Sequence, residues 1–362
     1  MRSLESSLPP ELFEKLEAHF QRTKDYFESL GSFAPEAVVL GGGYGRAEGG
    51  VYRTETGESA LFNDLDYFIF TNRPEQAELL SAVHVWERDE SKLLGIDVEG
   101  KCLPVSDVEA ADRSMMFFDL VSGHLVVAGP EDYLTPYRKL ANPETIDAVE
   151  STRLLWNRGS GLYFALCDLS ARENLDLVHR NQSKVKLALG DAWLAIRGKY
   201  RALAEERHAL LLTEEEVDPR IKELHATGYA FKKGPTPTPE FDELLETQAV
   251  LTELWMDCFL SVESIRLGQD FKQSGDYADY PGALYPDTSK GRNLLLAFRD
   301  RLKRGGMLRP LGDYPRGALQ RALVILLSEA KQVKHAGDFL GVNGARPADF
   351  SMAYRRWWGF YS

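Results

Sequence analysis

Short apolar runs of strand length dominate the first 140 residues of the chain. They alternate with polar or glycine-rich segments, a pattern that predicts short β-strands. Two other stretches carry apolar residues at a spacing of three and four, which predicts amphipathic helices. The expected strands are residues 37–40, 61–70, 94–103 and 124–127, and the expected helices are residues 9–31 and 73–88.

From about residue 143 onward the pattern is almost wholly helical. Strands and helices are therefore segregated along the chain, which favours an α+β fold over a doubly wound sheet. The predicted organisation is an N-terminal helix in residues 1–33, a small mixed-sheet core in 34–140 and an all-helical domain in 141–362. The expected helices of this last domain are residues 143–157, 159–172, 180–204, 240–267, 288–304 and 317–335.

The charge balance of the chain limits its partners. A net charge of −12 argues against broad, sequence-independent binding of nucleic acid, which needs many basic groups near phosphates. The charge is uneven, however, because residues 289–321 contain nine basic and two acidic side chains. This segment is interpreted either as a charged helix face or as a site for an anionic or aromatic ligand.

Several absences also guide the interpretation. No run of 18 apolar residues is present, so no membrane partner is expected. The N-terminus lacks the apolar region of a secretory signal. The three cysteines, Cys102, Cys167 and Cys258, form no CxxC pair, which disfavours a zinc site or a disulfide framework and fits a reducing cytoplasm.

The segment most informative about chemistry covers residues 38–70. It contains a strand, a glycine turn, a connector, and then Asp-Leu-Asp at the start of a second strand. Residues two apart in a strand share a face, so Asp64 and Asp66 point the same way, about 6.5–7 Å apart along the chain. Two such carboxylates repel each other unless a cation intervenes. Mg²⁺ or Mn²⁺ takes oxygen ligands of this kind and completes its shell with water and substrate phosphates.

The glycine turn supplies a second element of the candidate site. In GGGYGRAEGG, residues 41–50, the glycines let backbone N–H groups approach a triphosphate with no Cβ in the way. Gly42 and Gly43 are the expected phosphate contacts, and Arg46 adds positive charge. A dinucleotide-binding GxGxxG motif does not fit, because the pattern that starts at Gly41 fails at Arg46 and the one that starts at Gly43 fails at Glu48.

These motifs together resemble the nucleotidyltransferase superfamily that includes DNA polymerase β and the antibiotic nucleotidyltransferases. The text GGYGRAE at residues 42–48 is especially similar to the uridylyltransferases that modify signalling proteins. The resemblance covers roughly residues 35–130. It implies that Gly42 and Gly43 are the family's glycine pair and that Asp64 and Asp66 are its metal carboxylates. The 20 residues between Gly43 and Asp64 exceed the family norm, so an insertion is expected there.

The resemblance also implies a third carboxylate on a neighbouring strand. The sequence GIDVEG offers Asp97 and Glu99, which share one strand face. Asp97 is the first choice because it stands between apolar residues, and Glu99 is the alternative. This group would bind the catalytic metal with Asp64 and Asp66, and would help to deprotonate the acceptor hydroxyl.

The helical domain offers a further candidate for binding the triphosphate. Residues 180–200 are similar to the second-domain helix that supplies a cation in this superfamily. Lys184 is the expected phosphate ligand, with Lys186 as second choice. Solvated lysines on an amphipathic helix are the equally weighted alternative.

The expected function is therefore metal-dependent transfer of a nucleoside monophosphate from a nucleoside triphosphate, such as ATP, to an acceptor hydroxyl, with release of pyrophosphate. The acidic bulk of the chain favours a small molecule or a protein as acceptor over RNA. The alternative is a non-catalytic nucleotide-binding regulatory or toxin–antitoxin module.

Overall fold

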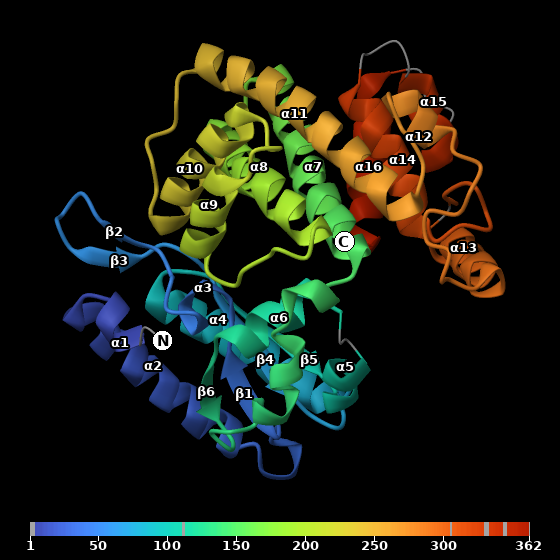
Figure 1. Cartoon of the computed structure of the whole chain (residues 1–362). Helices are drawn as coiled ribbons and strands as arrows, with labels where there is room; N and C mark the ends of the chain where they lie inside the picture. Colours follow the sequence, from blue (N-terminus) through green and yellow to red (C-terminus); the bar gives the residue numbers. More distant parts are fainter. Residues whose placement is uncertain (1–3, 111–112, 305, 329–332, 343–345, 362) are drawn as a thin grey trace. The chain divides into compact units, whose positions relative to one another are not determined.

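A computed structural model of the chain describes residues 4–110, 113–304, 306–328, 333–342 and 346–361 (Figure 1). The chain divides into two compact units. The first contains residues 1–150 and 197–237, and the second contains residues 151–196 and 238–362. The fold is α+β, with a small mixed sheet and many helices, as the sequence predicts. The return of residues 197–237 to the first unit is not part of that prediction.

The first unit is built on a four-stranded sheet in the order β5-β4-β1-β6. β1 is antiparallel to both β4 and β6, whereas β4 and β5 are parallel. All four are apolar enough to form the centre of the unit, and β1 is buried along its whole length. Their bounds are β1 (Ala37–Leu40), β4 (Leu65–Phe70), β5 (Val98–Leu103) and β6 (Leu125–Ala128).

Each face of this sheet carries its own apolar core. Alternate residues of β4 point to opposite faces, so Tyr67 and Ile69 pack against the long helices α2 and α4, whereas Phe68 and Phe70 pack on the side of α6. The helices that belong to the first unit are α1 (Leu4–Ser7), α2 (Pro10–Glu28), η1 (Gly31–Phe33), α3 (Gly42–Gly45), α4 (Ala77–Leu94), α5 (Val105–Ala110), α6 (Met115–Ser122), η2 (Thr135–Leu140), η3 (Pro143–Thr145), α9 (Ala204–Thr213) and α10 (Pro219–Lys233).

The connector between the glycine turn and the two aspartates folds as a separate β-hairpin. β2 (Val51–Arg53) pairs antiparallel with β3 (Ser59–Leu61) and forms a two-stranded sheet. The expected strand 61–70 is therefore two strands, because Asn63 and Asp64 break the run between β3 and β4. The insertion expected from the length of the connector is this hairpin.

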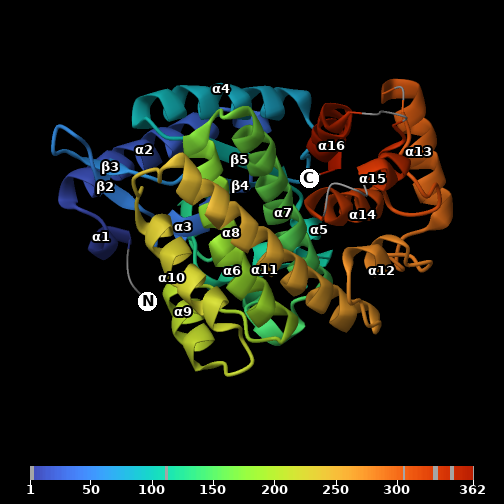
Figure 2. The same ribbon diagram turned by 90° about the horizontal axis from the view of Figure 1, so that it is seen from above.

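The second unit consists of helices. Among them, α8 and α11 pack along each other over much of their length (Figure 2). Their bounds are α7 (Ala148–Ala171, most of which lies in this unit), α8 (Leu175–Ile196), α11 (Phe241–Leu267), α12 (Ser274–Ala278), α13 (Lys290–Arg304), α14 (Pro315–Leu327), α15 (Val333–Leu340) and α16 (Pro347–Tyr361).

The expected helical boundaries need two corrections here. The expected helices 143–157 and 159–172 are one continuous helix, α7. Its Gly159 does not break the helix but allows the ring of Trp255 on α11 to approach, since a Cβ at position 159 would overlap that ring. The expected helix 180–204 ends instead at Ile196, and Gly198 follows with a positive φ of 67°. Residues 329–332 of the expected helix 317–335, and residues 1–3, lie outside the described residues.

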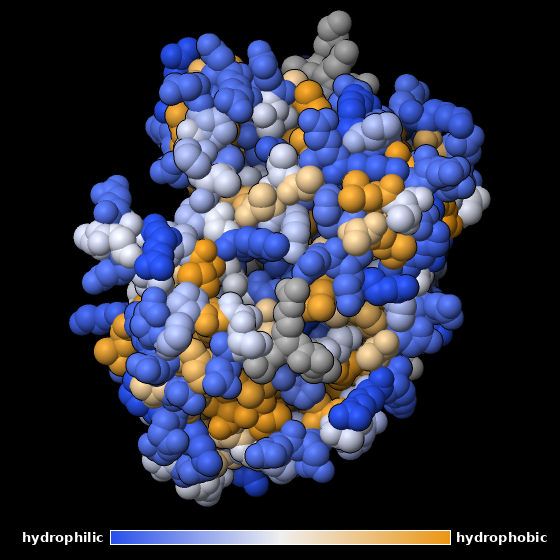
Figure 3. All heavy atoms as spheres, turned by 60° about the vertical axis from the view of Figure 1, so that its left-hand side comes forward, coloured by the Kyte–Doolittle hydropathy of each residue, from blue (hydrophilic) through white to orange (hydrophobic). Residues whose placement is uncertain are grey.

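The exposed surface is mainly polar. Hydrophilic side chains cover most of the face drawn in Figure 3, and apolar groups lie on it in separate patches. None of the helices in the described ranges is both long and apolar enough to cross a membrane.

A buried polar network joins α2 and α4 to the central strand. The His19 side chain on α2 is completely buried, with Nδ1 at 2.7 Å from Glu90 Oε2 and Nε2 at 2.7 Å from the Tyr67 hydroxyl. Arg22 donates two hydrogen bonds to the same carboxylate. Burial lowers the pKa of His19 and outweighs the attraction of Glu90. The network therefore fixes the helices on the sheet with His19 neutral near pH 7.

This burial makes the stability of the first unit depend on pH. Below about pH 6.5 the unfolded chain binds a proton at His19 that the folded chain resists, so stability falls as the pH decreases. We expect the urea midpoint to drop less between about pH 7.5 and pH 5.5 in His19→Gln than in the wild type. Replacement of the exposed His84 by Gln is the control, and an equal drop in both variants would contradict the assignment.

Candidate functional site

The two aspartates lie where β4 begins. Asp64 directly precedes the strand and Asp66 is its second residue, and both are partly exposed. Asp66 shares its sheet face with Phe68 and Phe70, the face that α6 covers farther along the strand. The edge of the sheet therefore holds two carboxylates next to a largely apolar core.

The glycine turn faces Asp66 directly. The antiparallel register sets Leu40 opposite Tyr67, so the turn that follows β1 begins opposite Asp66, and the Gly41 amide donates to the Asp66 carbonyl at 2.8 Å. Gly42 has a φ of 59°, and a Cβ at this position would overlap Oδ2 of Asp66. Glycine is required there on both counts, because the space that a side chain would fill belongs to the carboxylate. The turn itself continues as the short helix α3.

A tyrosine in the glycine turn holds both ends of the connector. Tyr44 is buried, its hydroxyl donates to the Gly50 carbonyl at 2.7 Å, and the Phe62 amide donates to the same hydroxyl at 3.2 Å. Asn63 Oδ1 accepts from the Gly50 amide at 2.6 Å. Burial, and to a smaller degree the charge of Asp64, raises the pKa of Tyr44 to about 12. These contacts fix the residue that precedes Asp64 to the turn.

The neighbouring strand distinguishes the two candidates for the third carboxylate. The parallel register pairs Asp66 with Glu99, and Glu99 lines the same pocket as Asp64 and Asp66. Asp97 is exposed, lies before β5 begins, and contributes its backbone carbonyl to Leu65. Sequence reasoning chose Asp97 first, whereas the geometry places its alternative, Glu99, beside the aspartates.

A row of alternating charges lies behind the glycine turn. Arg46 is largely buried and contacts Glu48 at 3.1 Å and Asp119 of α6 at 3.3 Å. Burial disfavours the charged form of Arg46, but Asp119 and Glu48 outweigh it and raise its pKa above the ordinary value. Burial raises the pKa of Asp119 despite the attraction of Arg46. Oδ1 of Asp119 is buried and has no hydrogen-bond partner among the described residues.

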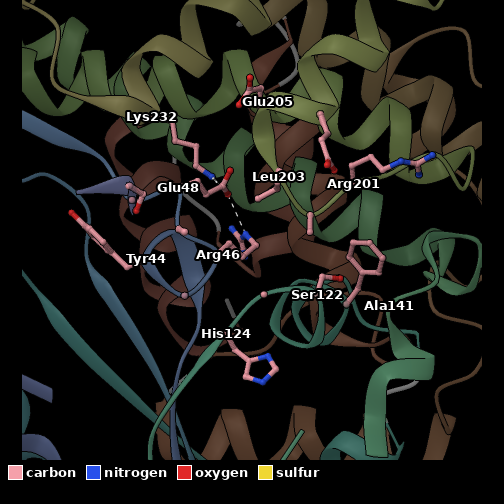
Figure 4. A pocket seen from close by; sticks show the side chains of 18 of the residues that line it. Tyr44, Arg46, Glu48, Ser122, His124, Ala141, Arg201, Leu203, Glu205 and Lys232 are labelled. Atoms are coloured by element: carbon pink, nitrogen blue, oxygen red, sulfur yellow. Dashed lines mark hydrogen bonds and ion pairs between the residues drawn. The ribbon is translucent and has the colours of Figure 1, made fainter. Parts of the chain in front are cut away.

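Lys232 brings a second cation to this row from the far end of α10. Its Nζ lies 2.6 Å from Glu48 Oε1, so Glu48 stands between Lys232 and Arg46 (Figure 4). Burial lowers the pKa of Lys232, although Glu48 opposes the shift. The carboxylate of Glu48 also accepts from the Ala204 amide at the start of α9. One glutamate thus ties the glycine turn to both helices that return to the first unit.

Two pockets meet at this row of charges. One has a volume of 720 Å³ and is lined by Gly42, Gly43, both aspartates, Glu99 and Lys101. The other, drawn in Figure 4, has a volume of 1300 Å³ and is lined by the opposite side of the turn, including Tyr44 and Glu48. Arg46 and Lys232 line both pockets. The smaller pocket collects carboxylates on one wall and cations on another, a charge arrangement that suits a polyanion bound with a divalent cation.

The residues expected to bind phosphate are placed differently. Gly42, Gly43 and Arg46 line the smaller pocket. Lys184 lies on α8 of the second unit, and its role in phosphate binding remains a prediction. Sequence analysis did not identify Lys232 or Asp119. Lys232 follows the glycine turn by more than 180 residues, and nothing in FKKG distinguishes it from a solvated helix end.

The donor set fits a hard divalent cation. Asp64, Asp66 and Glu99 offer carboxylate oxygens, and Gly42 leaves space at Asp66 that any side chain would remove. Among the described residues, no group of three or more His, Cys, Asp or Glu side chains is already arranged to hold a metal ion. Mg²⁺ usually binds through one or two protein carboxylates, with water and substrate phosphates completing the shell.

Comparisons with known proteins add no identification. No protein-family model, curated protein or solved structure matches the chain.

The contact between Gly42 and Asp66 leads to a matched prediction. Gly42→Ala and Gly31→Ala both place a side chain at a φ near 59°, but position 31 has no atom within 4 Å of the new Cβ. Each variant should lose about 1 kcal/mol from the backbone conformation. We expect Gly42→Ala to lose more, because Asp66 must move. Urea unfolding measures the difference, and equal losses would contradict the proposed packing.

Proposed function

We propose that the chain transfers a nucleoside monophosphate from a nucleoside triphosphate to a hydroxyl of a small molecule or a protein. In this proposal the first unit is a nucleotidyltransferase core, and the 720 Å³ pocket binds the triphosphate. The observation that carries the proposal is the packing of Asp66 against Gly42, with Asp64 beside it at the start of β4. It joins a phosphate-binding turn to a pair of metal-binding carboxylates.

The strand order supports the same assignment. The superfamily that the sequence resembles requires a third carboxylate on a strand next to the one that carries the aspartates. β5 is that neighbour, and its Glu99 is in register with Asp66. The 720 Å³ pocket is therefore lined by all three kinds of group that the resemblance implies, namely glycine backbone, paired aspartates and a further carboxylate.

The charges of the pocket suit a triphosphate. Asp64, Asp66 and Glu99 would hold Mg²⁺ or Mn²⁺, which when bound neutralises phosphate charge and orients the oxygens of the triphosphate. Arg46 and Lys232 supply fixed positive charge from the protein itself. Their common partner Glu48 holds both side chains in place before substrate arrives, so little reorganisation is needed on binding.

The reaction is a substitution at the α-phosphorus. The acceptor oxygen forms a bond to this atom, the bond from the α-phosphorus to the oxygen bridging to the β-phosphate breaks, and pyrophosphate leaves. The proton of the acceptor hydroxyl passes to a carboxylate, for which Glu99 is the best-placed candidate. Arg46 and Lys232 stabilise the negative charge on the departing pyrophosphate.

Removal of the paired aspartates tests the proposal directly. We expect calorimetry to detect Mg²⁺-dependent binding of at least one of the four ribonucleoside triphosphates, weakened about tenfold or more in Asp64→Asn/Asp66→Asn because the ion loses its protein ligands. Asp132→Asn, an exposed aspartate of the same unit, is the control. No binding of any triphosphate to the wild type would refute the proposal. Binding without turnover would favour the non-catalytic module.

The two candidates for the third carboxylate can be separated by isosteric changes. Glu99→Gln should reduce turnover about a hundredfold or more, since it removes the base that lines the pocket. Asp97→Asn should change turnover less than threefold, because its side chain is exposed outside the strand. Pyrophosphate release at saturating triphosphate is the measurement. The reverse order of the two effects would restore Asp97 as the third carboxylate.

A further inference from the structure

Helix α13 in the second unit presents its apolar side to solvent. Its most exposed residues are Leu295, Phe298 and Leu302, with exposed fractions of 72%, 64% and 84%, and Leu294 beside them is 42% exposed. Positions 295, 298 and 302 are three and four apart, so these side chains form one stripe along the helix, about 12 Å long. A soluble helix normally turns such a stripe toward the core.

Polar residues hold the opposite side of the same helix inward. Asn293 and Asp300 are each only 2% exposed. The Asn293 side chain donates to Thr288 Oγ1 and to the Gly312 carbonyl, both at 3.1 Å, and the Tyr361 hydroxyl donates to Asp300. These bonds fix the rotation of α13 about its axis. The outward position of the leucines and the phenylalanine is therefore specified by contacts of the inner face.

Basic side chains border the stripe on both sides. At 100° per residue, Arg292, Arg299 and Lys303 fall along one edge of the stripe, and Arg301 falls along the other. All four residues are exposed, and Arg299 contacts Asp300 at 3.3 Å. In Figures 1 and 2 α13 lies at the periphery of the second unit. This arrangement combines an apolar insertion surface with cations that can reach phosphates.

We propose that α13 docks on the surface of an anionic lipid bilayer. The stripe of Leu294, Leu295, Phe298 and Leu302 enters the boundary between headgroups and acyl chains, and the flanking arginines and lysine bind lipid phosphates. This is a property of the second unit, independent of the function proposed for the first. The expectation of no membrane partner rests on the absence of a spanning segment, which a helix lying in the membrane surface does not need.

The charge and size of the stripe favour lipid over the other occupants. A symmetric pair of α13 helices from two copies would bring their basic rows together, which like-charge repulsion opposes. A single stripe about 12 Å long is small beside the 1,200–2,000 Å² that stable protein interfaces usually bury. The net charge of −12 does not prevent binding, because charges more than about 8 Å from the lipid are screened at physiological salt.

Vesicle sedimentation tests this proposal with the full chain. We expect the wild type to sediment with vesicles of phosphatidylcholine and about one-third phosphatidylserine, at least tenfold more strongly than with phosphatidylcholine alone. Leu295→Gln/Phe298→Gln/Leu302→Gln should weaken this binding about tenfold or more, because it removes the inserted side chains. Added salt should weaken the binding of the wild type.

The matched control removes equally exposed apolar groups from other helices. Leu212→Gln/Ile265→Gln/Met352→Gln changes three side chains that are 54%, 51% and 63% exposed, and it should bind vesicles like the wild type. Failure of the wild type to bind anionic vesicles, or equal binding by the α13 variant, would overturn the proposal. Self-association in size-exclusion chromatography that only the α13 variant loses would overturn it in favour of a second copy.

Discussion

The candidate site depends on one close approach, between the Asp66 carboxylate and a backbone position that carries no side chain. The antiparallel pairing of β1 and β4 brings the end of one strand to the beginning of the other, so the turn after Leu40 must pass Asp66. Only glycine at position 42 satisfies both the positive φ and the lack of space. Tyr44 then fixes the connector, and through Asn63 it fixes the approach to Asp64.

The charges around this contact form a layered arrangement. Carboxylates lie on the strand side of the smaller pocket, and Arg46 and Lys232 lie on the other side, with Glu48 between the two cations. Buried ions of one sign are costly without partners. Glu48 and Asp119 therefore make it possible to keep two positive charges beside a pocket before any anion is bound. The same partners restrict the positions of both cations, which is the property that a substrate-binding site needs.

The sequence predicts the parts of the site that are close together in the chain. β1 is predicted at its observed residues, and the Asp-Leu-Asp pair is correctly placed at the start of a strand, because both signals are local. The choice between Asp97 and Glu99 is not local, since it depends on the register of two strands, and alternation alone puts both residues on one face. Lys232 is further from prediction, because its partner Glu48 is 184 residues away. The expected break in α7 is wrong for the same reason, since Trp255 gives Gly159 its role.

The return of residues 197–237 to the first unit has a consequence for synthesis of the protein. The sheet, the glycine turn and both aspartates emerge from the ribosome early, but Lys232 follows only after α7 and α8 have been translated. Contacts of such long sequence separation close late and slow folding. A nascent chain therefore passes through a stage in which Glu48 and Arg46 are present and Lys232 is not. During that stage the carboxylates outnumber the cations, and the incomplete pocket repels the anions that the finished one is built to attract.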